Sequence, residues 1–304
     1  MRTYIDAHVH ITPEGRIGHT DPRFGGTYRE YGYLDRPEGG FYTMPPYIHD
    51  TQFTADTLVR MMDVYHVEKA VIQQTIMNPL NEAVADAVRS YAARLRGAMI
   101  LEYTDEWMEQ MDRWQEAGLT SVKYEMRAYT DPKCFPEAIY DADRMMRMFE
   151  EAGKRNLTVT IDPGPTYLPA YRPEALERAV ASLPETRFVI CHIAYPMPVD
   201  EPESWDKWER MLSVSRHTNC WLDVSAMPDF FDAEGWPYPT AQKLLAKAKE
   251  TAGAKYLIWG SDITGTLLRA TYPQMQEMYV RGGVFSEEEL KLLFRENAVN
   301  AYQL

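Results

Sequence analysis

Two histidines separated by one residue, His8 and His10, stand at the end of the first strand-like segment of the chain. Alternate side chains of a strand point to the same face, so these imidazoles lie on one side with their Cα atoms about 7 Å apart. At that spacing they can bind one cation, and imidazole suits zinc, iron, nickel or copper. The pair alone is a weak signal, because two unrelated histidines at a strand end give the same pattern.

Three more polar residues follow strand-like segments in a similar way. His192 and Asp162 come directly after such segments, and Asp262 follows the last one after Gly260 and Ser261. Each residue alone fits a cap of the following turn, which is a common role of Asp. The set is a stronger signal than any member, provided that the fold brings these strand ends together.

Strand-like and helical patterns alternate along the whole chain. Apolar residues spaced i, i+3, i+4, i+7 predict helices over Leu58–Tyr65, Ala142–Phe149 and Leu176–Leu183. Ser286 and Glu289 form a capping box that opens a last helix. The predicted strands are Thr3–His8, Lys69–Gln73, Gly97–Glu102, Thr120–Tyr124, Leu157–Ile161, Arg187–Cys191, Cys220–Val224 and Tyr256–Trp259.

Eight strands that alternate with helices predict an α/β fold, a (β/α)₈ TIM barrel that fills residues 1–304 as one domain. A doubly wound open sheet is the alternative, but no glycine-rich phosphate loop follows the first strand, which weakens a nucleotide-binding version. In barrel enzymes the active site lies at the carboxyl ends of the strands. The barrel therefore predicts that the polar strand ends converge.

The segment 11–53, directly after His10, has no clear periodicity and is rich in glycine and aromatic residues. Loops longer than about 15 residues in a compact domain are usually functional or disordered, and disordered segments are poor in aromatic residues. We therefore expect an ordered insertion that covers the barrel mouth as a lid, or that packs against a second subunit. A second segment, 226–238, carries Phe230 and Trp236 and could form the opposite wall.

The charge balance of the 304-residue chain is acidic, with 32 Lys and Arg against 45 Asp and Glu and a formal net charge of −13. This balance argues against nucleic acid as a partner. No apolar run approaches the roughly 18 residues that a membrane span needs, and the N-terminus shows no signal sequence. Three cysteines are too few for a disulfide scaffold. We expect a cytoplasmic protein that acts on a small molecule, either as a monomer or as a homo-oligomer.

The residues Asp6-Ala7-His8-Val9-His10, the histidine at 192 and Trp259-Gly260-Ser261-Asp262 resemble the amidohydrolase superfamily. The branch that they resemble is the amidohydrolase-related group that includes aminocarboxymuconate semialdehyde decarboxylase. The resemblance implies a distorted TIM barrel that holds one divalent metal ion, zinc most often, with manganese as the alternative. It implies that His8, His10 and Asp262 are metal ligands and that His192 is the catalytic acid or base.

One position departs from the pattern of that group. The fifth strand should supply a histidine ligand, and the chain has Asp162 there. Aspartate also binds zinc or manganese, so we expect Asp162 to be the fourth ligand. The open alternatives are a remodelled site that has lost the reaction, or one in which His192 replaces the missing ligand. Lys123 and Glu125 share a face of the fourth strand and could pair with each other, or Lys123 could pair with Asp6.

Three residues are candidates for contact with a substrate. Arg127 follows the fourth strand and could bind a carboxylate through two parallel hydrogen bonds. Tyr124, at the end of that strand, and His49, in the long insertion, are the other two.

The favoured function is a metal-dependent hydrolase of a small carboxylate-bearing or cyclic substrate, of the lactone or amide type. A metal-activated water would be the nucleophile, His192 would carry the proton, and Asp262 would be a ligand that can also accept the water proton. A metal-dependent, non-oxidative decarboxylase of an aromatic or conjugated acid is the first alternative. A catalytically degenerate binding barrel, suggested by Asp162, is the second.

Overall fold

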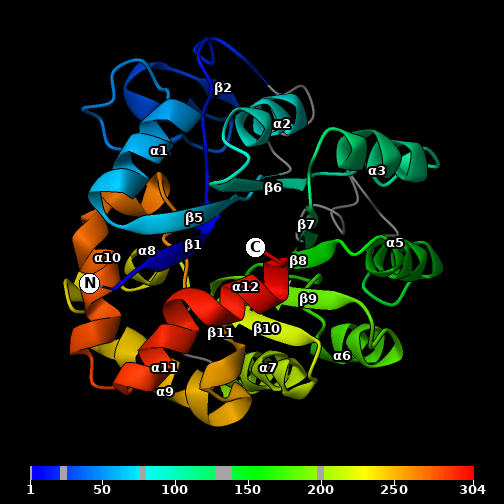
Figure 1. Cartoon of the computed structure of the whole chain (residues 1–304). Coiled ribbons are helices and arrows are strands. Elements are labelled where there is room, and N and C mark those ends of the chain that lie inside the picture. Colours follow the sequence, from blue (N-terminus) through cyan, green and yellow to red (C-terminus); the bar gives the residue numbers. More distant parts are fainter. Residues whose placement is uncertain (1, 21–25, 76–79, 127–138, 197–201) are drawn as a thin grey trace.

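A computed structural model describes residues 2–20, 26–75, 80–126, 139–196 and 202–304 of the chain. Eight parallel strands form a barrel in the order in which they occur along the chain (Figure 1). They are β1 (Tyr4–Val9), β5 (Val67–Ile72), β6 (Leu95–Met99), β7 (Ser121–Glu125), β8 (Thr158–Asp162), β9 (Arg187–Ile190), β10 (Cys220–Asp223) and β11 (Leu257–Ile258). The segment after β11 returns to β1, where Val9 bridges Ile263 and Ala7 N–H donates to Trp259 O at 3.2 Å.

Helices surround the barrel, and the TIM-barrel prediction is confirmed (Figure 1). They are α1 (Ala55–Val64), α2 (Asn81–Ser90), α3 (Trp107–Glu116), α5 (Asp143–Lys154), α6 (Pro173–Ser182), α7 (Pro202–Ser213), α8 (Met227–Phe230), α9 (Pro239–Ala252), α10 (Tyr272–Arg281), α11 (Glu287–Lys291) and α12 (Asn297–Tyr302). The three predicted helical patterns correspond to α1, α5 and α6. The predicted capping box at Ser286 and Glu289 opens α11. No helix among the described residues combines the length and the apolar character that crossing a membrane requires.

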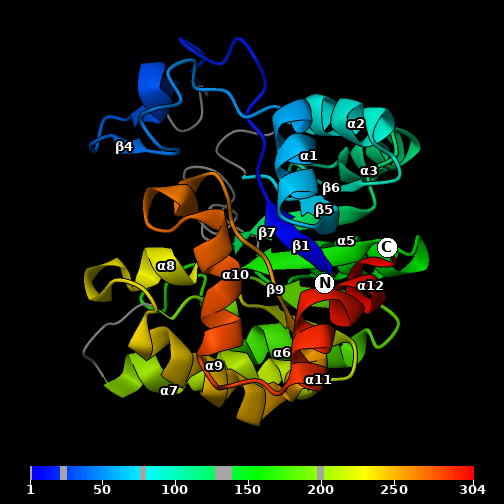
Figure 2. The same cartoon turned by 60° about the vertical axis from the view of Figure 1, so that its left-hand side comes forward.

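The amino end of the barrel is filled by apolar side chains and closed by α12. Ile5, Val71 and Val189 from the strands pack with Ala298 and Tyr302 of α12. The Tyr302 hydroxyl also lies 3.1 Å from the Thr160 hydroxyl inside the barrel. Both chain termini lie at this end, whereas the long insertion and α8 lie at the other (Figure 2). The carboxyl end is therefore the open end of the barrel.

The insertion after β1 folds into a small antiparallel sheet of β2 (Thr27–Tyr28), β3 (Tyr33–Asp35) and β4 (Phe41–Tyr42). Gly32 precedes β3 with φ at 72°, and a Cβ there would lie 2.2 Å from Met44 Cγ. This close approach and the left-handed backbone require glycine. The ordered insertion expected from its aromatic content is thus present in the described part of the segment 11–53.

Candidate metal centre

A cavity of about 390 Å³ opens at the carboxyl end of the barrel. Its floor comes from the strand ends, and one wall comes from the insertion, including Tyr28, Leu34 and Phe41. Ala226, Asp229 and Phe230 contribute a further part of the wall, from the segment around α8. Both segments that the sequence marked as candidate walls therefore border the cavity. The predicted site residues in its lining are His8, His10, Asp162, His192 and Asp262.

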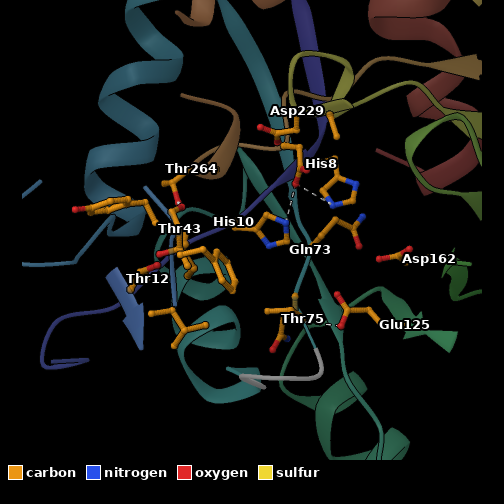
Figure 3. Close-up of a pocket in the computed structure, with 18 of the residues that line it drawn as sticks. His8, His10, Thr12, Thr43, Gln73, Thr75, Glu125, Asp162, Asp229 and Thr264 are labelled. Carbon is orange, nitrogen blue, oxygen red and sulfur yellow. Dashed lines mark hydrogen bonds and ion pairs between the residues drawn. The ribbon is translucent and has the colours of Figure 1, made fainter. Parts of the chain in front are cut away.

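Three of these residues form one cluster at the cavity floor. His10 Nε2 lies 2.9 Å and His8 Nε2 lies 3.6 Å from Asp262 Oδ1. Figure 3 shows the rings of His8 and His10 close together. The ligand atoms of all three residues lie within 4.8 Å of one another. His8 and His10 project from β1 and Asp262 from the segment after β11, so closure of the barrel brings together residues that are 252 positions apart.

Asp223, at the end of β10, fixes the orientation of the His8 ring. Its Oδ2 lies 2.5 Å from His8 Nδ1, and both side chains are fully buried. Burial, together with the charge of Lys123, holds the pKa of His8 well below its usual range, so the ring is neutral. A neutral ring that donates its Nδ1 proton to Asp223 presents the Nε2 lone pair to the cavity. A metal-ligating histidine needs this tautomer and this kind of carboxylate partner. The residues present thus fit a divalent metal ion.

We expect Asp223→Asn to lower the metal affinity by about 10–100-fold, the usual effect of losing the partner of a ligating histidine. Competition with a chelator measures this affinity. Asp229→Asn is the matched control, because Asp229 lines the same cavity and has no hydrogen bond to His8 or His10 among the described contacts. Equal affinities of the two variants would contradict the orienting role of Asp223.

The backbone at three strand ends takes the left-handed conformation. His192, Ala226 and Asp262 have φ values of 56°, 61° and 57°, and each belongs to the segment that leaves β9, β10 or β11. A residue with a Cβ pays about 1–3 kcal/mol for such a conformation, and residues of this kind cluster at functional sites. The strain lies where the strands turn away from the cavity.

The pKa of Asp262 is lowered, whereas that of an isolated buried acid would be raised. Burial alone would raise its pKa, but His192, the hydrogen bond from His10 and the nearby His8 hold it below the usual range. Burial lowers the pKa of His192 to about 4, and Asp262 only partly opposes this shift. At neutral pH Asp262 is therefore an anion and His192 a neutral imidazole, and both can accept a proton.

Lys123 on β7 lies at the cavity floor, where it contacts His8. Its Nζ is 3.3 Å from His8 Nε2, and the residue is 1% exposed. Burial alone would lower its pKa, but Cys191, Asp162 and other acids around it raise the pKa above the usual value. Glu125 is among the acids that raise this pKa, and both expected partners of Lys123 also make hydrogen bonds elsewhere.

Those partners are Glu125 and Asp6. Glu125 accepts from the Thr75 hydroxyl at 3.1 Å. Asp6 accepts from Ser261 N–H at 2.8 Å and from the Tyr272 hydroxyl at 2.7 Å. Asp6 thus fixes the segment that carries Asp262 and is not the partner of Lys123.

Asp162 does not complete the cluster as expected. It lines the cavity and is 3% exposed, and its Oδ1 accepts from Gly164 N–H at 2.9 Å. Its carboxylate is not among the groups of ligand atoms that lie within 4.8 Å of one another in the described part of the chain. The structure therefore brings together three of the four expected ligands, and Asp162 caps the turn after β8.

Two of the three candidates for substrate contact, Tyr124 and His49, lie outside the cavity lining. Tyr124 is fully buried, packs against Phe149 at a ring-centroid distance of 5.3 Å, and does not line the cavity. The expectation for Tyr124 is wrong, because alternation along β7 turns Lys123 and Glu125 inward and Tyr124 toward the helices. His49 also lies outside the cavity lining, with a side chain 55% exposed and its Nδ1 2.8 Å from Asp50. Arg127 lies outside the described residues.

Two acids of the site were not singled out by the sequence analysis. Asp223 ends β10 in the structure but lies inside the predicted strand Cys220–Val224, so the signal that marked Asp162 did not mark it. Asp229 lies in the second candidate wall, and burial together with the negative charge of Asp262 raises its pKa to about 7. Nothing in its sequence surroundings separates Asp229 from a surface acid.

Comparison with known proteins gives a family match and solved structures of similar fold. The sequence pattern described as amidohydrolase matches residues 5–304, whereas no curated protein matches the chain. A probable 2-pyrone-4,6-dicarboxylic acid hydrolase from Acinetobacter baumannii, solved with citric acid bound, is 18% identical, with a TM-score of 0.72 and full coverage of both chains. An amidohydrolase from Burkholderia multivorans with bound zinc is 16% identical, with a TM-score of 0.69 and full coverage of both chains. A 2,6-dihydroxybenzoate decarboxylase is 13% identical, with a TM-score of 0.62, over 84% of this chain and 89% of that one.

Proposed function

This chain belongs to the amidohydrolase family, and we propose that it is a metal-dependent hydrolase of a small cyclic substrate that bears a carboxylate. The observation that carries the proposal is the convergence of His8, His10 and Asp262 at the floor of a walled cavity. Zinc is the metal that we favour, with manganese as the alternative. Bound zinc in one related barrel and the pyrone dicarboxylic acid in the description of another support this choice of metal and of substrate.

His8, His10 and Asp262 would hold the ion. When bound there, a divalent metal lowers the pKa of a coordinated water and polarises a carbonyl oxygen. Asp262, as an anion, accepts a proton from the attacking water. His192 Nδ1 lies 2.9 Å from the Ser225 hydroxyl, so its Nε2 is left to carry a proton within the cavity. Lys123 contributes a buried positive charge that favours negative charge developing on the substrate.

Hydrolysis is favoured over decarboxylation by the protonation states of these groups. Activation of water requires proton acceptors, and both Asp262 and His192 are acceptors at neutral pH. Protonation of a ring carbon, as decarboxylation requires, needs a donor, and a histidine with a pKa of about 4 is a poor one at neutral pH.

Decarboxylation is the second candidate because the cavity holds one group that suits it. Asp229 has a pKa raised to about 7 and could donate a proton there. The 2,6-dihydroxybenzoate decarboxylase among the related barrels is consistent with this alternative.

The test measures two products from two substrate sets. Purified protein loaded with zinc is incubated with carboxylated lactones, with proton release as the readout, and with aromatic carboxylic acids, with carbon dioxide as the readout. We expect metal-dependent proton release from a lactone. Carbon dioxide release alone would establish the alternative, and neither product together with negligible metal binding would indicate a binding barrel.

We expect that shortening the insertion between Gly15 and Gly40 abolishes turnover while the oligomeric state stays the same. The removed segment includes Tyr28 and Leu34 of the cavity wall, and a wall that excludes water strengthens the electrostatic effects of the site. Activity and light scattering on the same sample give the two readouts. A subunit interface is the rival explanation, because five large apolar residues in the described part of the insertion are more than 40% exposed: Ile17, Tyr31, Phe41, Tyr42 and Tyr47. Dissociation with activity intact would establish that rival.

A further inference from the structure

His8 belongs to two groups of possible metal ligands. One is the outer group with His10 and Asp262, and the second is an inner group with Cys191 and His192. In each group the ligand atoms lie within 4.8 Å of one another. The rings of His8 and His192 are close, with centroids 4.7 Å apart, compared with 5.2 Å for His8 and His10. By the distances between its ligand atoms, the inner group can bind an ion as well as the outer group can.

Each histidine of the inner group has one nitrogen left for a metal. His8 Nδ1 is hydrogen-bonded to Asp223 and His192 Nδ1 to Ser225, so Nε2 is the remaining nitrogen on each ring. On His8 this nitrogen lies 3.3 Å from Lys123 Nζ, which an ion would displace. Because His8 has a single free lone pair, an ion in the outer group excludes an ion in the inner group. The two groups are thus alternative positions for one ion.

We propose that Cys191 is a metal ligand and that it forms, with His8 and His192, a deeper position for the ion. The inference rests on the metal dependence in the proposed function and is independent of the substrate. Cys191 directly follows β9, the sixth barrel strand, and its side chain is fully buried. A thiolate with two imidazoles is a softer donor set than two imidazoles with a carboxylate, and it favours zinc and cobalt over manganese.

The charges around Cys191 suit a bound cation. Asp162, Asp223 and Asp262 all lie near enough to Cys191 to act on it electrostatically, so a cation beside this thiol would be surrounded by negative charge. Coordination deprotonates a thiol, so the S–H bond breaks, the metal–sulfur bond forms and the proton passes to the buffer. The ion takes the place of Lys123 at His8 Nε2, and the acids around Lys123 remain as partners for its ammonium group.

The inner position would also explain why the chain needs no histidine after the fifth strand. Asp162 stands at that position and caps a turn. The inner position needs no ligand from that strand, because Cys191 and His192 come from the segment directly after the sixth strand.

Cobalt(II) substitution tests the proposal directly, since a cobalt–thiolate bond gives a charge-transfer band in the near ultraviolet. We expect this band in the wild-type protein loaded with cobalt and its loss in Cys191→Ala and Cys191→Ser. The serine variant guards against misfolding of the alanine variant, and circular dichroism checks both. Cys220→Ala is the matched control, because Cys220 is also fully buried, yet it packs in the core outside the barrel.

A second variant separates the two positions. His10→Ala removes a ligand of the outer group only, so the charge-transfer band should persist. Cobalt bound without the band, or a band that survives in Cys191→Ala, would overturn the inner position and leave the proposed function standing. Loss of the band in His10→Ala would also overturn it, by showing that His10 and the thiol share one site. The band without any hydrolysis would support Cys191 and count against the proposed function, and no bound cobalt would refute both.

Discussion

Replacing His8 with alanine is expected to remove nearly all bound metal and, with it, turnover. Loss of a partner of a ligating histidine costs about 10–100-fold in metal affinity, and loss of the ligand itself should cost more than 100-fold. His8 contributes to both groups of ligand atoms, so no second position rescues the variant. Metal per chain after dialysis, measured by atomic emission, gives the result.

His217→Ala is the control for this experiment, because His217 is partly exposed and lies near Glu177, far from the cavity lining. His10→Ala offers a graded comparison, since it leaves the inner group intact. Metal content in His8→Ala equal to that of the wild type would refute the assignment of the centre.

The alternation of side chains along strands made part of the site predictable. His8 and His10 share a face of β1, and the polar residue after the last strand, Asp262, joins them once the barrel closes. The same rule, applied to β7, would have excluded Tyr124, whose neighbours Lys123 and Glu125 point inward. A residue at a strand end can contact the cavity only when its side chain is on the inner face of the barrel.

Contacts between distant side chains were not predictable in the same way. The pairing of Asp223 with His8 depends on which of several buried acids reaches the ring, at 2.5 Å, across the barrel. Asp162 stands where the resemblance predicts a ligand, but a hydrogen bond from Gly164 fixes its carboxylate in a turn. Sequence spacing predicts which residues lie at the strand ends. Which of their side chains contact one another depends on packing across the barrel.

The insertion shows a similar limit. The described part of this segment contains a small sheet and lines the cavity, which fits its aromatic content and its start after His10. The small sheet of β2, β3 and β4 has strands of two or three residues, too short for any alternation to be visible in the sequence. Its order depends on contacts such as the close packing of Gly32 against Met44.

We expect His192→Asn to lower kcat by about 10²–10⁴-fold, the usual contribution of a group that moves a proton. The variant should retain about one metal ion per chain, because the outer group of His8, His10 and Asp262 is unchanged. Since burial lowers the pKa of His192 to about 4, the wild-type imidazole is a neutral base above that pH and is lost as a base when the pH falls through it. Wild-type kcat/KM should therefore decline on the acid side toward pH 4. In the variant this decline should be weaker, because protonation of His192 no longer contributes to it.

The pH profile and the metal content together separate a proton carrier from an obligatory ligand. A proton carrier gives full metal content with a changed acid limb, whereas an obligatory ligand gives parallel losses of metal and activity. His217→Asn should alter neither quantity. Parallel losses in His192→Asn would mean that the ion occupies only the position with Cys191, and that His192 replaces the histidine which the fifth strand lacks.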